Sequence, residues 1–281
     1  MTSFPKVIWM FWLQGWEHAT ELSRLCLRSW RELNPEWEVV PLSRYNIEQY
    51  LELDSITDDF YSKKPISCSV DLLNLNLLNQ YGGIWIDSTV LCQKPLDSWI
   101  GNSLDTGFFA HKFDPPVTIN DGAEKPRILS TWFIAADAGH YIIKKWCERY
   151  NDYWLGRKEP DFYFDFHYLF YDLYCEDPKI KSVFDKTLSI SAQEQHRLCD
   201  FRDQPLQPNV VDQILKGNHA LTKFQNVYED NTYEGEEVVQ KLAQAKHEKH
   251  KLENSDIRGL REMYDLVTYQ YANLQKLARD L

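Results

Sequence analysis

Apolar runs and amphipathic stretches alternate along the N-terminal part of the chain. Residues 6–12 are almost wholly apolar and lead into Gln14-Gly15, so they predict a buried strand that ends in a loop. From about residue 20 to 33 apolar residues recur at helical spacing, and Asn34-Pro35 is expected to end the helix. Residues 37–42 predict a second short strand. This β-α-β order is typical of the first half of a doubly wound sheet.

A second helix is predicted over residues 69–81, where the leucines leave only a narrow polar stripe. Gly82-Gly83 is expected to end this helix, and residues 84–86 to re-enter the sheet as a central strand. Asp87-Ser88-Thr89 follows, where that strand should run out. Because ligands bind at the carboxyl ends of strands in open α/β sheets, we expect the chemistry at this position.

The middle of the chain has a less regular pattern. Residues 113–130 contain Asp114-Pro115-Pro116 and Asp121-Gly122, and they predict a long mobile loop. The pattern then predicts a strand, a helix and an aromatic helix, over residues 131–135, about 139–154 and 161–175. These elements together predict a single α/β domain with helices flanking the sheet.

Composition shifts after Tyr228, because residues 229–281 contain no Trp or Pro. Apolar residues there alternate spacings of four and three, which predicts a heptad seam. The seam consists of Leu260, Tyr264, Val267, Tyr271, Leu274, Ala278 and Leu281. We therefore predict a main domain over residues 1–228 and a C-terminal helical appendage over 229–281. A hairpin packed on the main domain, a homodimer seam and a peripheral membrane contact are all open as its role.

Charge and composition exclude some functions. The 31 Lys and Arg face 42 Asp and Glu, a net charge of −11, which argues against a broad basic surface for nucleic acid or anionic lipid. Aromatic residues make up 14 %, with 10 Trp and 16 Tyr, more than core packing alone calls for. This excess suggests exposed aromatic platforms for a ligand.

The sequence gives three indications of the compartment. The first residues show no basic region followed by a cleavable apolar stretch, and no window approaches ~18 consecutive apolar residues. The six cysteines are scattered, without a CxxC pair or metal-ligand spacing. We expect reduced thiols in a cytoplasmic protein, with peripheral contact at the inner face of the membrane left open.

Asp71 and Asp87 are the strongest candidates for chemistry. The diphosphate of a nucleotide sugar is usually neutralised by a hard divalent cation held by carboxylates, and that charge also stabilises the leaving group. A strand-end Asp87, and Asp71 near the start of the preceding helix, are well placed for metal and ribose contacts. From spacing alone, simple capping of a turn and of a helix explains these two residues equally well.

Several short motifs follow one another in order over about residues 4–225. They are Phe4-Pro5-Lys6-Val7-Ile8-Trp9, Ser29-Trp30 before Asn34-Pro35, Ser69-Val70-Asp71-Leu72-Leu73, Tyr81-Gly82-Gly83-Ile84-Trp85-Ile86-Asp87, Thr131-Trp132-Phe133-Ile134, Phe164-Asp165-Phe166-His167 and Leu221-Thr222-Lys223. In this order and spacing, the chain resembles the capsular polysaccharide synthesis family of bacterial glycosyltransferases. That family is related to the sugar transferases with an Asp-x-Asp motif and a GT-A fold.

The resemblance implies a GT-A-like, Rossmann-like mixed sheet and a nucleotide-diphosphate sugar donor, most often a UDP-sugar. Trp9 and Trp12 would lie beside the base, and Asp71 near the ribose or the donor sugar. Asp87 would lie at the diphosphate and its metal, Mn²⁺ or Mg²⁺. Gly83, in the same motif as Asp87, is counted with the donor-binding residues.

Two residues depart from the pattern of that family. Thr89 stands where relatives with the full motif have a second carboxylate, and Asn74 stands where many have an arginine. Both positions are still expected at the donor. Without the second carboxylate, three possibilities are open for the metal: weaker binding, completion by His219, or absence.

Late basic residues are candidates for contacts with the diphosphate. His219 can bind a metal through a neutral imidazole, and Lys223 offers a point charge to phosphate. A structural histidine is the more ordinary explanation of His219. Lys125 and Arg127, on the predicted loop, are the next candidates.

Asp165 and His167 are the candidates for a catalytic base. If transfer inverts the anomeric centre, a general base must take the proton of the acceptor hydroxyl. Two residues apart on a helix their side chains diverge by about 200°, so we do not expect them to act together. Trp132 is expected to stack on the acceptor, although core packing explains both Trp132 and His167 equally well.

We therefore predict a hexosyltransferase that moves sugar from a nucleotide donor, a UDP-hexose, to a saccharide acceptor in capsular or other surface polysaccharide synthesis. The expected acceptor is lipid-linked. A non-catalytic nucleotide- or carbohydrate-binding protein is the alternative, motivated by Thr89 and Asn74. A glycoside hydrolase ranks last, because nothing in the sequence sets two carboxylates at the required ~5–10 Å.

Overall fold

The computed structural model describes residues 4–51, 66–196 and 220–223. These residues form two compact units. The first unit contains residues 4–18, 36–51, 66–87 and 99–192, and the second contains 19–35, 88–98, 193–196 and 220–223. The predicted domain boundary at residue 228 and the C-terminal appendage lie outside the described residues.

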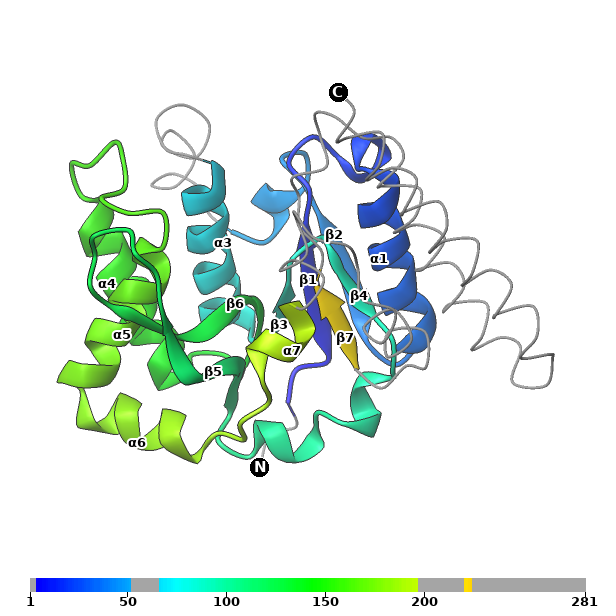
Figure 1. The fold of residues 1–281 in the computed structure, drawn as a ribbon. Helices are drawn as coiled ribbons and strands as arrows, with labels where there is room; N and C mark the ends of the chain where they lie inside the picture. The colour runs from blue at the N-terminus through cyan, green and yellow to red at the C-terminus, as the bar shows by residue number, and fades with distance from the viewer. Residues whose placement is uncertain (1–3, 52–65, 197–219, 224–281) are drawn as a thin grey trace, which may run out of the picture. The chain divides into compact units, whose positions relative to one another are not determined.

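A five-stranded sheet lies at the centre of the first unit (Figure 1). Its strands, in order across the sheet, are β2 (Glu38–Leu42), β1 (Val7–Phe11), β3 (Gly83–Ile86), β6 (Pro126–Ala136) and β5 (Phe108–Thr118). β1 pairs in parallel with β2 and β3, whereas β6 pairs antiparallel with β3 and β5. The predicted mixed α/β sheet is therefore confirmed, including the parallel pair expected of the β-α-β opening.

The two central strands β1 and β3 are buried on both faces. Ile8 of β1 is in register with Ile84 of β3, and both side chains are fully buried. Trp9 pairs with Trp85 one position along, and both of these are buried as well. Because successive side chains of a strand point to opposite faces, burial on both faces accounts for the unbroken apolar runs in these segments.

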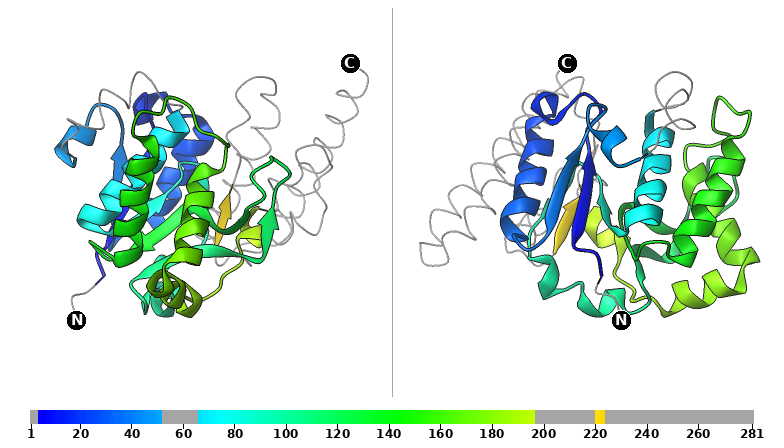
Figure 2. Two further views of the ribbon diagram at one scale, coloured as in Figure 1. Left: turned by 90° about the vertical axis from the view of Figure 1, so that its left-hand side faces the viewer. Right: turned by 180° about the vertical axis from the view of Figure 1, so that it is seen from behind.

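Several helices pack against one face of this sheet (Figures 1 and 2). They are α3 (Ile66–Tyr81), α4 (Tyr141–Trp154), α5 (Asp165–Glu176) and α6 (Pro178–Lys186). Their apolar side chains form one hydrophobic core with Trp9 and Phe11 of β1. Shorter helices are η1 (Trp16–His18), η2 (Ile47–Gln49), η3 (Leu96–Ser98), η4 (Gly101–Leu104) and α7 (Ala192–His196).

The predicted mobile loop over residues 113–130 is wrong, because β5 and β6 form a long hairpin there. Asp114-Pro115-Pro116, which suggested the loop, lies inside β5. Proline cannot donate a ladder hydrogen bond, but β5 is the last strand of the sheet and its register shifts between Lys112 and Val117. The prolines thus occupy the unpaired part of an edge strand. The opposite edge strand, β2, also contains a proline, Pro41.

The second unit joins helix α1 (Glu21–Leu33) to a two-stranded sheet of β4 (Val90–Cys92) and β7 (Leu221–Lys223). The predicted helix over residues 20–33 is confirmed: Thr20 caps α1 by accepting a hydrogen bond from the Ser23 amide at 3.1 Å. β4 and β7 run antiparallel, with Val90 opposite Lys223.

The Ser29-Trp30 and Asn34 motif connects α1 to β4. The Trp30 indole donates to the Val90 carbonyl at 2.8 Å, and the Ser29 hydroxyl accepts from the Cys92 amide at 3.0 Å. Asn34 is 3 % exposed and accepts from the Leu96 amide at 2.7 Å. The same side chain donates to the Trp30 carbonyl at 3.0 Å. The motif therefore satisfies the buried end of the helix and fixes the strand beside it.

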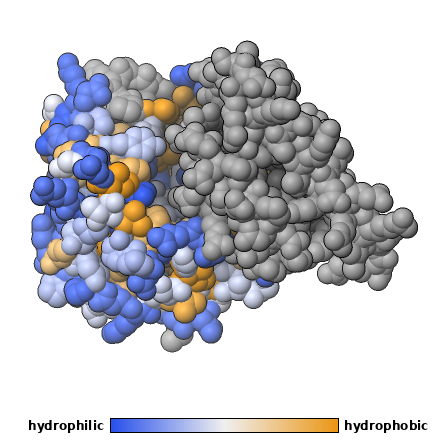
Figure 3. Space-filling view, viewed as in Figure 1, coloured by the Kyte–Doolittle hydropathy of each residue, from blue (hydrophilic) through white to orange (hydrophobic). Residues whose placement is uncertain are grey.

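No helix among the described residues is both long and apolar enough to cross a membrane. On the face drawn in Figure 3, hydrophobic side chains of the described residues are interspersed with hydrophilic ones.

We predict that Asn34→Ala lowers the free energy of unfolding by about 2–3 kcal/mol, because it leaves the buried Leu96 amide and Trp30 carbonyl without this partner. The measurement is urea unfolding followed by tryptophan fluorescence. Arg28→Ala, on the exposed side of the same helix, is the control and should change stability by less than about 0.5 kcal/mol. Equal stability of the two variants would contradict the anchoring role of Asn34.

Candidate functional site

Asp71 and Asp87 lie close enough in the first unit to interact electrostatically. Asp71 projects from the second turn of α3, and Asp87 directly follows β3. Burial, and then the charge of Asp87, raise the pKa of the Asp71 carboxyl well above its usual range, while the nearby Tyr150 hydroxyl opposes the shift. The structure thus brings together the two carboxyls that the sequence singled out, at the expected carboxyl end of a central strand.

Tyr150 is a member of this cluster that the sequence analysis missed. It lies on α4, is 1 % exposed, and its hydroxyl donates to the Cys68 carbonyl at 3.3 Å. Burial and the neighbouring Asp71 raise the pKa of the Tyr150 hydroxyl, which keeps it protonated. A polar hydroxyl at an apolar position of α4 was the available signal, but its partner on α3 cannot be read from periodicity.

A carboxyl with a raised pKa has a distinct chemical use. When Asp71 is protonated it can donate a hydrogen bond to a hydroxyl or phosphate oxygen, whereas an ionised carboxylate can only accept. Asp87 supplies the negative charge whose repulsion favours that protonated form. A carboxyl with a raised pKa beside a second carboxyl is an arrangement found where one site needs both a donor and an anion.

Trp9 and Trp12 occupy different environments. Trp9 is 3 % exposed, donates to the Gly82 carbonyl at 2.9 Å, and lies against Tyr50 and Tyr81 with ring centroids 5.3 and 5.6 Å away. Trp12 directly follows β1 and is half-buried, and its indole nitrogen has no hydrogen-bond partner among the described residues. Trp12 is the more accessible of the two, and contact of either ring with a base stays a prediction.

Gly83 and Asn74, two further residues predicted at the donor, are both buried. Gly83 begins β3 with φ of +89°, and a Cβ there would collide with Val7 of β1, so only glycine fits this close approach. Asn74, one turn beyond Asp71 on α3, is 1 % exposed, and its Oδ1 has no hydrogen-bond partner among residues 4–51, 66–196 and 220–223. Contact of these residues with the donor stays a prediction.

Thr89 and Lys223 contact each other in the second unit. The Lys223 Nζ donates to the Thr89 Oγ1 at 2.7 Å, and Thr89 is 2 % exposed. The antiparallel pairing of β4 and β7 produces this contact, because Lys223 lies opposite Val90, the neighbour of Thr89. Two residues that the sequence analysis selected separately therefore form one pair.

Binding of the expected Mn²⁺ or Mg²⁺ at Asp87 and His219 stays a prediction, but the Thr89 side chain is a poor ligand for such an ion. Its hydroxyl accepts from an ammonium group, which would repel a divalent cation at that oxygen. Within the described part of the chain, no three His, Cys, Asp or Glu side chains form a group that could hold a metal ion. His219, the other predicted metal ligand, lies outside the described residues.

Asp165 and His167 take different positions at the start of α5. Asp165 is 8 % exposed and accepts hydrogen bonds from the Phe162 amide at 2.9 Å and from the Tyr153 hydroxyl. These bonds engage the Asp165 carboxylate at the helix N-terminus. The half-buried His167 instead places Nε2 3.4 Å from the Thr131 Oγ1 of β6. Of the two predicted bases, Asp165 is the one whose carboxylate accepts the Phe162 amide at the start of the helix.

Trp132, the predicted acceptor-stacking residue, is 3 % exposed and stacks on His111 with 4.6 Å between ring centroids. Contact with an acceptor stays a prediction.

Lys125 and Arg127 lie on the β5–β6 hairpin and its connection instead of a mobile loop. Lys125 pairs with Asp172 at 2.7 Å.

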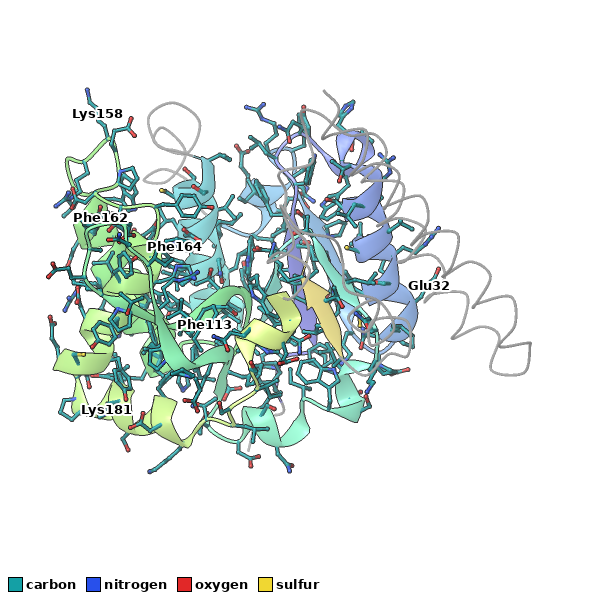
Figure 4. The ribbon with its side chains drawn as sticks, viewed as in Figure 1. Glu32, Phe113, Lys158, Phe162, Phe164 and Lys181 are labelled. Atoms are coloured by element: carbon teal, nitrogen blue, oxygen red, sulfur yellow. The ribbon has the colours of Figure 1, made fainter. Side chains whose placement is uncertain are left out.

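Arg127 lies over two aromatic rings. Its guanidinium carbon is 4.9 Å from the ring centroid of Phe113 and 4.2 Å from that of Phe164. Figure 4 labels these two aromatic side chains, Phe113 on β5 and Phe164 just before α5. Burial lowers the pKa of this guanidinium, although neighbouring Tyr168 and Asp121 oppose the shift.

Comparisons with known proteins agree on one class of protein. A family described as "Capsular polysaccharide synthesis protein" matches residues 2–242. "Glycosyltransferase afumC" of Aspergillus fumigatus is 30 % identical over 171 residues, 55 % of this chain and 42 % of that protein. "O-glycosyltransferase braB" of Annulohypoxylon truncatum is 26 % identical over 163 residues, 54 % of this chain and 38 % of that protein.

The "Initiation-specific alpha-1,6-mannosyltransferase" of Candida albicans is 25 % identical over 170 residues, 55 % of this chain and 44 % of that protein. The matched region thus spans less than half the length of each of these curated relatives. Among solved structures, "PaToxG Glycosyltransferase" superposes with a TM-score of 0.41 at 16 % identity, covering 77 % of this chain and 86 % of that one.

We predict that Asp71→Asn raises the melting temperature at pH 8 by about 2–4 °C, the shift that ~1 kcal/mol gives in a domain of 150–250 residues. The folded-state pKa of Asp71 is raised, so its contribution to stability is present below the ordinary carboxyl pKa and is lost as pH rises through the folded-state value. The gain in Asp71→Asn should therefore shrink as pH falls toward 5.

The measurement is thermal unfolding of both proteins from pH 5 to 9, with the exposed Asp105→Asn as the control. A melting temperature at pH 8 that does not exceed that of the control would contradict the electrostatic cost assigned to Asp71.

Proposed function

We propose that this chain, which belongs to the capsular polysaccharide synthesis family, is a glycosyltransferase that moves a hexose from a nucleotide-diphosphate donor to a saccharide acceptor. UDP is the proposed nucleotide, and surface polysaccharide synthesis, with a lipid-linked acceptor, is the proposed setting. The printed names of the relatives, a glycosyltransferase, an O-glycosyltransferase and a mannosyltransferase, support sugar transfer as the reaction class.

The observation that carries the proposal is the Asp71–Asp87 pair at the end of β3. A glycosyl donor presents hydroxyls on its ribose and sugar and negative charge on its diphosphate, so its site needs both acceptors and donors of hydrogen bonds. Protonated Asp71 can donate, and Asp87 can accept from donor hydroxyls. Trp12, half-buried at the end of β1, is the proposed platform for the base.

The acceptor side of the reaction needs a base if transfer inverts the sugar. In that case His167 is the proposed base, because the Asp165 carboxylate is engaged by the Phe162 amide and the Tyr153 hydroxyl. The hydroxyl of Thr131, 3.4 Å from the His167 Nε2, orients the imidazole.

We predict that Asp87→Ala lowers the rate of transfer at least about 100-fold, a loss typical of removing an electrostatic group at a reacting centre. The measurement is mass-spectrometric detection of donor hydrolysis and of transfer by the purified full chain, across UDP- and GDP-hexoses and saccharide acceptors. Asp105→Ala removes an exposed carboxylate and is the matched control. Turnover equal to wild type in Asp87→Ala would remove this residue from the mechanism.

The same assay separates the catalytic proposal from its alternative. A protein that binds nucleotides without transferring sugar would bind UDP, measured by calorimetry, yet show no turnover of any donor across the whole panel. Thr89 and Asn74, which replace charged residues of the family pattern, are the features that favour this alternative.

A further inference from the structure

Lys223 is held against Thr89 by a specific contact. Its ammonium donates to the Thr89 hydroxyl at 2.7 Å, and Thr89 lies two residues beyond Asp87 in the chain. This is the position at which the Asp-x-Asp pattern requires a second anionic ligand for a cation. In this chain the position holds the neutral hydroxyl of Thr89, whose oxygen already accepts a hydrogen bond from the Lys223 ammonium.

The fold fixes this ammonium through several contacts. Lys223 ends the short strand β7, whose Leu221 and Thr222 are buried, and β7 pairs with β4 across three residue pairs. The side chain of Gln93, just after β4, donates to the Thr222 hydroxyl. A lysine on a paired strand with a buried hydrogen-bond acceptor is preorganised, so less conformational entropy is lost when it binds an anion.

The charges of the whole chain favour a local cation of this kind. The chain has a net charge of −11, so an approaching diphosphate meets general repulsion and needs a local positive group. A divalent ion is usually held by carboxylates together with the phosphates of the substrate. The Lys223 ammonium, hydrogen-bonded to the Thr89 oxygen, repels a metal ion but attracts a phosphate.

We propose that the Lys223 ammonium, positioned by Thr89, binds the diphosphate of the sugar donor in place of a divalent cation. This inference rests on the proposed function, because it assigns the group that neutralises the donor of that reaction. In the transfer step the bond between the anomeric carbon and the β-phosphate oxygen breaks, and its electron pair leaves with the nucleoside diphosphate. The acceptor oxygen bonds to the anomeric carbon, and its proton passes to a base.

Lys223 keeps its own proton throughout this step. Its charge offsets the negative charge that develops on the leaving phosphate oxygen, which is the role a metal has in a metal-dependent transferase. Thr89 is a positioning residue here, because it acts on the diphosphate only through Lys223.

The first experiment measures binding of UDP and of inorganic pyrophosphate to the full chain by isothermal titration calorimetry, in EDTA and then in Mn²⁺. Wild type should bind both probes in EDTA, with an affinity that Mn²⁺ changes by less than about threefold. Lys223→Met should weaken both affinities by about 10- to 100-fold, the loss expected for one charge-assisted contact. Lys223→Arg should retain most of the binding.

Lys144→Met removes an exposed lysine of α4 and should bind as wild type does. Binding by wild type that is lost in EDTA would overturn the inference without any variant, so the test stands even if Lys223→Met does not fold. Unweakened binding by a folded Lys223→Met would overturn it too. If wild type binds neither UDP, GDP nor pyrophosphate in any condition, the proposed function falls together with the inference.

A second variant tests the exchange of lysine for metal directly. Thr89→Asp combined with Lys223→Ser restores a second carboxylate and removes the ammonium. UDP binding by this double variant should be weak in EDTA and should recover at least about tenfold with Mn²⁺, whereas wild type should not respond. No response to Mn²⁺ by a folded double variant, together with a response by wild type, would show that the metal binds elsewhere and would reject the exchange.

Discussion

The position of the candidate site depends on one short strand, β3, that is held on both sides. β1 pairs with β3 in parallel and β6 pairs with it antiparallel, so hydrogen bonds on both sides fix the direction and register of β3. Gly83 makes this possible, because only a residue without a Cβ lets β3 begin so close to Val7 of β1. Asp87 follows β3 immediately. Its amide donates to the Trp132 carbonyl at 2.9 Å, so pairing within the sheet also fixes the backbone of Asp87.

Burial and a neighbouring charge both disfavour an ionised Asp71 at that strand end. Burial raises the pKa of the Asp71 carboxyl, and the charge of Asp87 raises it further. Carboxyls with raised pKa values occur often at functional sites, and this favours our proposal that the pair binds a ligand over simple capping.

The sequence was sufficient to predict the elements whose hydrophobic pattern follows directly from burial. It was not sufficient for elements that depend on which other segment lies beside them. The apolar runs of β1 and β3 were recognisable because both of their faces are covered, and α1 because its apolar residues recur at helical spacing. The hairpin strand β5 was missed because Pro115 and Pro116 are tolerated only at an edge, which is a tertiary fact. Helix α6 was not predicted either. It is nine residues long and buries only Ile180 and Phe184, which are too few apolar positions to show a helical repeat.

The same distinction holds for the site. Asp71 and Asp87 could be selected from the sequence, but the Tyr150 contact and the Lys223–Thr89 hydrogen bond join segments far apart in the chain, so neither could be predicted from local pattern. The two outer strands of the sheet both contain proline. Among the described residues, β2 contains Pro41 and β5 contains Pro115 and Pro116, so each outer strand lacks amide donors at these positions. A strand from another molecule that approached either outer strand would find an incomplete ladder there, which disfavours pairing between sheets of different molecules.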